Sequence, residues 1–223
     1  MGRSIELEAA DGHRLAAYVA EPAGAIRGGL VVIQEIFGVN RHIRAVADDY
    51  AGQGFVAIAP ALFDRVERGV DWDYGPDSIG KGREIAGKIV PDAALTDVAA
   101  ALDWARANAP GKSGVIGYCM GGLLAWLAAT RLHPAASVSY YGGQIGKYAG
   151  ERPHCPAIFH FGEQDQHIPL ADVRRLQDAH PDLSVFLYPA GHGFNCDERA
   201  TYHAESARLA RLRSIDFLRK YLS

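Results

Sequence analysis

The sequence predicts an α/β protein in which helices cover both faces of a mostly parallel sheet, preceded by an antiparallel hairpin. Two observations carry this prediction. Short, continuously apolar runs recur along the chain, and between them lie segments with the period of amphipathic helices. Such runs are typical of strands buried on both faces, and strands that alternate with helices form parallel sheets. We expect the whole chain, 1–223, to form one domain.

The first expected elements are the two strands of the hairpin. The alternating run IELEA (5–9) leads to Asp11-Gly12, a dipeptide that favours a tight turn, and RLAAYVA (14–20) is again extended. Six later apolar runs predict buried strands at 28–35, 55–60, 113–118, 136–141, 157–162 and 184–189. Helical patterns lie between or after these runs, at 44–54, 91–111, 122–132 and 170–180.

Two further segments have distinct interpretations. The C-terminal segment is expected to be a helix with an apolar face made of Leu209, Leu212, Ile215, Leu218 and Leu222. The segment 63–90 is polar and has no clear period. Because it follows the carboxyl end of an expected strand, it is a candidate lid or pocket wall, with an ordinary surface excursion as the alternative.

Composition excludes several classes of function. The net charge of -3 and the pI near 6.3 argue against nucleic acid as a partner. Neither a signal peptide nor an apolar segment of membrane-spanning length is visible, so a cytoplasmic protein without membrane contact is expected. The three cysteines favour reduced thiols, although a Cys119–Cys155 disulfide stays open, and no cysteine or histidine spacing points to a metal. The oligomeric state is open, with a monomer among the options.

Cys119 lies in GYCMGG (117–122), between an expected strand and an expected helix. This G-x-C-x-G pattern is the cysteine form of a sharp strand-to-helix turn that presents a nucleophile, and its glycines avoid collisions with neighbouring backbone. The N-terminus of the helix favours the thiolate. A buried structural cysteine is the alternative.

Two other residues complete a nucleophilic constellation. His192 lies in the glycine-containing loop PAGHGF, where it could act as general base. Asp165, in GEQDQHIP, could hold the imidazole, although an aspartate in a polar turn is more often a cap. The chain order nucleophile, acid, histidine is that of α/β-hydrolases.

Glu35 ends the first long apolar run, in VVIQEIFGVN. A carboxylate there needs a partner if it is buried, and it could contact the Cys119 thiol and influence its ionisation. The backbone N–H groups of Ile36 and Met120 are expected to form an oxyanion hole.

The motifs QEIFGVN, GYCMGG, GEQDQHIP and AGHGF together resemble the dienelactone hydrolase (carboxymethylenebutenolidase) family over nearly the whole chain. The resemblance implies an α/β-hydrolase fold, no cofactor, and a triad of Cys119, Asp165 and His192. It implies that substrate displaces Glu35, which helps to generate the thiolate, and that the substrate is a small lactone or ester bearing a carboxylate.

The residues that bind the substrate carboxylate are less well matched to that family. Its pattern has two arginines; Arg83 is the candidate for the first, with Lys81 as a competitor. The second falls at Cys196, which carries no positive charge, and Arg199 is a possible substitute. The sequence therefore favours ester or lactone hydrolysis more strongly than dienelactone itself.

Several aromatic and polar residues have two readings. Phe37 is a candidate pocket residue, and Tyr118, Tyr140, Tyr141 and Phe194 could line the pocket or belong to the core. His133, His160 and Cys155 are expected to be structural. The alternatives for function are a general carboxylesterase, a non-catalytic ligand-binding protein of this fold, and a thiol redox protein.

Overall fold

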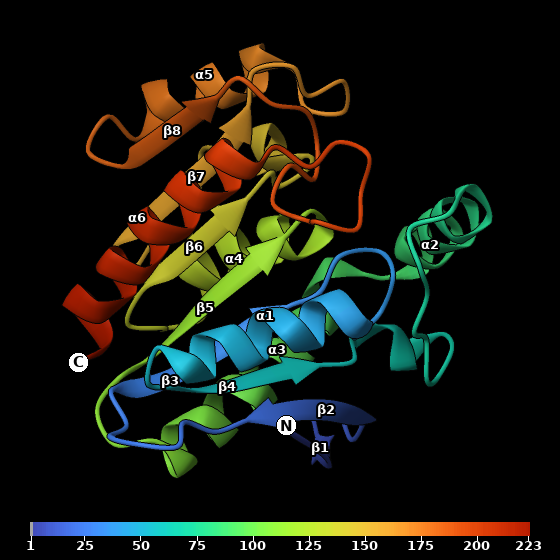
Figure 1. Cartoon of the computed structure of the whole chain (residues 1–223), viewed down its shortest axis with the longest axis vertical. Coiled ribbons are helices and arrows are strands. Elements are labelled where there is room, and N and C mark those ends of the chain that lie inside the picture. The colour runs from blue at the N-terminus through green and yellow to red at the C-terminus, as the bar shows by residue number, and fades with distance from the viewer. Residues whose placement is uncertain (1) are drawn as a thin grey trace.

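The structure, a computed structural model that describes residues 2–223, contains one eight-stranded sheet with strand order β1-β2-β4-β3-β5-β6-β7-β8 (Figure 1). The strands β1 and β2 form an antiparallel pair, β2 also pairs antiparallel with β4, and all other neighbours are parallel. This confirms the predicted fold class. The strands are β1 (Arg3–Glu8), β2 (Arg14–Ala20), β3 (Gly28–Ile33), β4 (Phe55–Pro60), β5 (Ser113–Tyr118), β6 (Ser137–Tyr140), β7 (Ala157–Gly162) and β8 (Ser184–Tyr188).

Helices cover both faces of this sheet. One face carries α1 (Arg41–Gly52) and α6 (Ala204–Leu222), and the other carries α3 (Pro91–Asn108), α4 (Met120–Arg131) and α5 (Leu170–Ala179) (Figure 1). Short 3-10 helices occupy Leu62–Arg65 and Ile145–Tyr148. The remaining helix, α2 (Pro76–Lys88), lies beyond the carboxyl ends of the central strands, outside the two helical layers.

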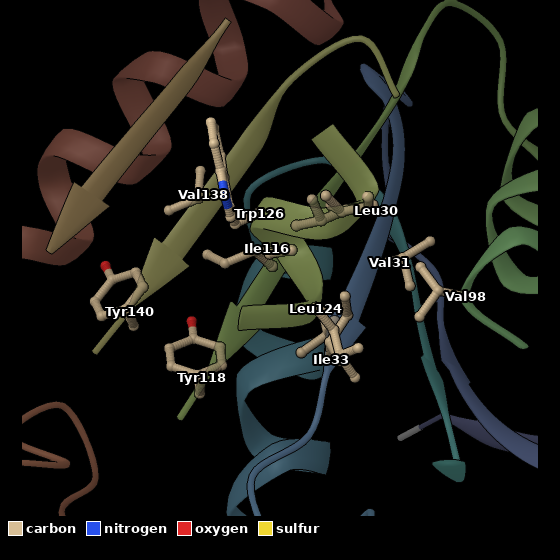
Figure 2. Close-up of a cluster of buried hydrophobic side chains, with 14 of the residues drawn as sticks. Leu30, Val31, Ile33, Val98, Ile116, Tyr118, Leu124, Trp126, Val138 and Tyr140 are labelled. Atoms are coloured by element: carbon tan, nitrogen blue, oxygen red, sulfur yellow. The ribbon is translucent and has the colours of Figure 1, made fainter. Parts of the chain in front are cut away.

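The core lies along both faces of the central strands. Every residue of β3, β4, β5 and β7 is buried, which explains why these strands appear in the sequence as unbroken apolar runs. Figure 2 shows part of this core, including Trp126 and Leu124 from α4 and the neighbouring rings of Tyr118 and Tyr140. Burial of each large aliphatic side chain stabilises the fold by about 1.5–3 kcal/mol.

Three elements differ from the sequence prediction. The helix α2 is absent from the prediction because its sequence, PDSIGKGREIAGK, contains three glycines and buries only Gly82 and Ile85, so no apolar period is visible. The strand β8 is only partly buried, since it lies at the edge of the sheet and pairs with β7 alone.

Within residues 2–223, no helix combines the length and apolarity needed to cross a bilayer.

The third difference concerns the C-terminal helix α6. Ile215, Leu218 and Leu222 are buried, as predicted, but Leu209 and Leu212 are 36% and 42% exposed. A spacing of three residues falls about 60° short of a full turn, so Leu209 and Leu218 point to opposite sides of the helix. Small residues such as Ala207, Ala210 and Ser214 complete the buried face instead.

Candidate active site

Cys119 lies at the turn between β5 and α4 with φ of 56°, a conformation that is uncommon for a non-glycine residue. The two glycines around it permit this turn. A Cβ atom on Gly117 would collide with the carbonyl oxygen of Gly121, and one on Gly121 would collide with that of Ile33. The steric reason for the G-x-C-x-G pattern is therefore confirmed. The Gly121 N–H also donates to the Gln34 carbonyl at 3.1 Å, which joins the turn to the end of β3.

The structure brings Cys119, His192 and Asp165 together from three loops at the carboxyl edge of the sheet. The Cys119 Sγ lies 3.2 Å from His192 Nε2, and His192 Nδ1 lies 2.7 Å from Asp165 Oδ2. The other carboxylate oxygen of Asp165 accepts hydrogen bonds from the backbone N–H groups of His167 at 2.8 Å and Ile168 at 3.2 Å. Thr201 fixes the histidine loop by donating to the His192 carbonyl at 2.7 Å. Each member of the predicted triad has the contact that its chemistry requires.

The charge state of His192 follows from these contacts. Burial alone lowers its pKa, but the Cys119 sulfur at 3.2 Å and the hydrogen bond to Asp165 outweigh burial and raise the pKa to about 10. An imidazole with this pKa holds its proton at neutral pH, between the Asp165 carboxylate and the Cys119 sulfur. His167, whose ring is 5.1 Å from that of His192, has its pKa lowered by burial and by the neighbouring imidazolium.

Glu35 is fully buried at the end of β3, but its partners differ from the expected one. Its Oε2 accepts a hydrogen bond from the Tyr74 hydroxyl at 2.8 Å, and its Oε1 accepts one from Arg199 Nη1 at 3.3 Å. Within residues 2–223, no hydrogen bond joins Glu35 to the Cys119 thiol. The glutamate is thus held beside the triad by an arginine and a tyrosine.

Phe37 supports this carboxylate cluster and does not belong to the cavity at Cys119. Its ring packs against Tyr74 at 4.4 Å, and the Arg199 guanidinium lies 5.6 Å from the ring centroids of both aromatics. Tyr74 is not predictable from the sequence, because its segment has no period and a single tyrosine there carries no signal. Arg199, by contrast, is a candidate from the sequence alone.

A cavity of about 540 Å³ opens next to Cys119. Its lining residues include Ile36, Arg83, Cys119, Met120, Gln144 and Tyr148. Within residues 2–223, the backbone N–H groups of Ile36 and Met120 have no acceptor in the protein, so both are available to a substrate oxygen. The segment 63–90 does contribute a wall, because Arg83, Ala86 and Gly87 of α2 line the cavity. Lys81 is exposed and is not among the lining residues.

The other aromatic and polar candidates separate into two groups. Tyr141 and Phe194 are buried next to the site, and the Tyr141 ring lies 5.2 Å from that of His192. Tyr118 and Tyr140 border a different cavity, between α1 and α6. Of the two other histidines, His160 is buried between Tyr188 and Ser214, and His133 is exposed. The cysteines Cys119, Cys155 and Cys196 form no disulfide.

An eight-stranded sheet of this topology, with a cysteine at the strand-to-helix turn and a histidine and an aspartate on later loops, defines an α/β-hydrolase. The family model of the dienelactone hydrolase family matches residues 15–222. The chain therefore belongs to the dienelactone hydrolase family.

Individual relatives agree with this assignment. The chain is 35% identical to the carboxymethylenebutenolidase of Pseudomonas putida over 226 residues, which cover 96% of this chain and 94% of that protein. It is 36% identical over 213 residues to a Synechocystis protein provisionally named carboxymethylenebutenolidase, with 87% of each chain covered. A solved structure from Klebsiella pneumoniae, provisionally described as a dienelactone hydrolase, superposes with a TM-score of 0.84 at 28% identity, covering 99% of this chain and 100% of that one.

Proposed function

We propose that this chain hydrolyses a lactone or activated ester through a cysteine acyl-enzyme, with carboxymethylenebutenolidase chemistry, dienelactone to maleylacetate, as the leading reaction. The observation that carries the proposal is the line of contacts from Cys119 Sγ to His192 Nε2 at 3.2 Å and from His192 Nδ1 to Asp165 at 2.7 Å. A nucleophile, its base and an orienting carboxylate in this geometry are what acyl transfer requires.

The reaction divides into two acyl-transfer steps. The Cys119 thiolate attacks the substrate carbonyl carbon, and the N–H groups of Ile36 and Met120 stabilise the negative oxygen of the tetrahedral intermediate. Collapse breaks the carbonyl–oxygen ester bond and forms a thioester, while the His192 imidazolium gives its proton to the departing oxygen. Water then attacks the thioester as His192 takes up its proton, and the second collapse releases a carboxylic acid and the free thiol group of Cys119.

Positive charges near the cavity support a substrate that bears a carboxylate. Arg83 lines the cavity itself, whereas Arg199 lies beside it, paired with Glu35. An incoming carboxylate can replace Glu35 as the partner of Arg199. The released glutamate is then free to approach the thiol, as the family resemblance implies. In this account Arg199 takes the role of the second arginine, whose place in the sequence is occupied by Cys196.

A general carboxylesterase with a different substrate is the second candidate. The observation that favours it is the pairing of Arg199 with Glu35. Because of this pairing, Arg83 is the arginine of residues 2–223 that directly lines the cavity, so only one of the two expected arginines is in place for a substrate carboxylate. A purely ligand-binding protein is less well supported, because binding alone does not require a thiol aligned with an imidazole.

The test compares matched variants on a lactone that bears a carboxylate and on its neutral methyl ester. Cys119→Ala is expected to lower kcat by at least about 10⁴-fold on both, whereas Cys155→Ala retains activity. Arg83→Met is expected to raise KM at least about tenfold for the carboxylate only. The control on the same helix is Lys81→Met, which should leave both KM values unchanged.

Full activity in Cys119→Ala would eliminate the acyl-enzyme proposal. If Cys119→Ala is inactive but Arg83→Met affects both substrates equally, the general carboxylesterase becomes the better description.

A further inference from the structure

A second cluster of chemically active side chains lies on the same loop as His192. Cys196 and Asp197 lie between His192 and Arg199 in the chain, and the fold packs them against His42 in the first turn of α1. One donor atom from each of His42, Cys196 and Asp197 lies within 4.8 Å of the other two. The sequence shows no metal-ligand spacing here because His42 is remote from the other two residues in the chain.

His42 is the unexplained member of this cluster. It is 6% exposed, and its Nδ1 lies 3.3 Å from Asp197 Oδ1, whereas its Nε2 is buried with no hydrogen-bond partner in residues 2–223. A buried nitrogen without a partner costs about 1–3 kcal/mol, so native structures rarely leave one unpaired. A metal ion bound to Nε2 would supply the missing partner and remove this cost.

We propose that His42, Cys196 and Asp197 form a binding site for Zn²⁺. Imidazole, thiolate and carboxylate are the three donor types that zinc takes in proteins, at bond lengths of about 2.0–2.3 Å. Tetrahedral ligands at those lengths are separated by about 3.3–3.8 Å. The imidazole already lies beside the Asp197 carboxylate, with Nδ1 3.3 Å from Oδ1. Donor atoms within 4.8 Å of one another need to close by at most about 1.5 Å to reach the zinc-ligand separation.

Binding also requires a fourth ligand, a route of entry and the loss of one proton. A cavity of about 360 Å³ between α1 and α6 is lined by both His42 and Asp197 and has room for a water ligand. The Asp197 side chain is 70% exposed, so solvent reaches the cluster there. The Cys196 thiol, whose pKa burial and Glu35 raise to about 12, releases its proton to solvent as the zinc–sulfur bond forms.

Zinc at this position would fasten the catalytic loop to α1. The loop already turns tightly at Cys196, whose N–H donates to the Gly193 carbonyl at 3.0 Å and whose carbonyl accepts from the Arg199 N–H at 3.2 Å. A metal bond from Cys196 to His42 would hold this turn, and with it His192 and Arg199, in place. We therefore expect zinc to raise the melting temperature by at least about 2 °C.

The test uses Co²⁺ as a probe, because its bond to a thiolate gives a charge-transfer absorption, followed by displacement with Zn²⁺. All variants carry Cys119→Ala, since Cys119 and His192 could themselves bind metal. The Cys119→Ala protein is expected to bind one Co²⁺ per chain with thiolate absorption. Adding Cys196→Ala should abolish this absorption and weaken zinc binding at least about tenfold. Adding Cys155→Ala in place of Cys196→Ala keeps the Cys196 thiol. This variant should change neither the thiolate absorption nor the zinc affinity.

Absence of thiolate absorption in the Cys119→Ala protein would overturn the proposal, as would absorption that disappears with Cys155 and persists without Cys196. A second variant guards against misfolding of the buried cysteine mutant. Asp197→Asn changes an exposed side chain and should also weaken zinc binding about tenfold. An unchanged affinity in Asp197→Asn would exclude the three-ligand site.

Discussion

At the scale of single residues, the contacts of His192 favour its protonated form. The folded-state pKa of His192, about 10, lies above its ordinary value of 6.5. The contacts that raise this pKa therefore stabilise the fold fully below about pH 6.5, and this contribution disappears as the pH rises through about 10. The reactive form of the free enzyme should follow the same limit.

The first prediction concerns this alkaline limit. We expect kcat/KM to fall with an apparent pKa near 10, since kcat/KM reports the free enzyme. Asp165→Asn removes one cause of the raised pKa and should move the fall to lower pH. It should also lower kcat by about 10²–10⁴-fold, because the imidazole loses its orientation. A pH–rate profile of both proteins checks this, and identical alkaline limbs would contradict it.

A second prediction at this scale concerns Glu35. Its carboxylate compensates the charge of Arg199 beside the site, so Glu35→Gln leaves that positive charge unbalanced. Alkylation of Cys119 by iodoacetamide should then persist to lower pH than in the unmodified protein. Glu84→Gln on the exposed face of α2, where Glu84 pairs with Lys88, is the control. Superimposable pH profiles for Glu35→Gln and Glu84→Gln would exclude electrostatic control by Glu35.

At the scale of secondary-structure elements, α2 connects the wall of the cavity to the oxyanion segment. The helix packs so closely that a Cβ atom on Gly82 would collide with the carbonyl oxygen of Ile36. Ile36 is also the residue whose N–H faces the substrate in the proposed mechanism. The approach of α2 therefore fixes the position of Ile36, one of the two proposed oxyanion donors.

This contact predicts that alanine substitutions at two glycines of α2 affect kcat differently. Gly82→Ala should push Ile36 away and lower kcat, by about 10-fold or more, through loss of one oxyanion donor. Gly80→Ala meets nothing within 4 Å and should stabilise the protein by up to about 1 kcal/mol with unchanged kcat. Steady-state kinetics and thermal melts of both variants check this, and equal kcat values would contradict the proposed role of the contact.

At the scale of the whole molecule, a buried ion-pair network joins the turn of the N-terminal hairpin to α3 and to the 3-10 helix Leu62–Arg65. Asp97 of α3 is fully buried, and each of its carboxylate oxygens accepts a hydrogen bond from Arg65 at 2.7 Å. The same carboxylate lies 3.0 Å from His13 Nδ1 in the hairpin loop. Asp97 raises the pKa of Arg65 against the opposing effect of burial.

Asp97→Ala is expected to lower the free energy of unfolding by up to about 3 kcal/mol, because Arg65 and His13 lose their buried carboxylate partner while Arg65 keeps the more exposed Asp11. The triad lies elsewhere, so the folded fraction should retain its kcat. Asp103→Ala on the same helix removes an exposed pair with Arg106 and should change stability by less than about 0.5 kcal/mol. Urea denaturation measures the free energy of unfolding of both variants. Similar losses in the two would show that the buried network contributes no more to stability than an exposed ion pair.

Features that depend on residues close together in the chain are predictable from the sequence alone. Unbroken apolar runs predicted β3, β4, β5 and β7, because a strand buried on both faces needs an apolar side chain at almost every position. The turn at Cys119 was predictable because its steric requirement lies within five residues, Gly117 to Gly121. The order of Cys119, Asp165 and His192 along the chain then pointed to one site.

Only the tertiary structure decided which residues from distant parts of the chain meet. Glu35 pairs with Arg199 across 164 positions and with Tyr74 in a helix-flanking segment of no recognisable period. His42, Cys196 and Asp197 likewise converge from two separate elements. The physical reason is that backbone and burial preferences act locally, whereas the partner of a long polar side chain depends on how layers pack. Local sequence thus encodes the strands and the turn at Cys119, and packing sets the polar partners around that turn.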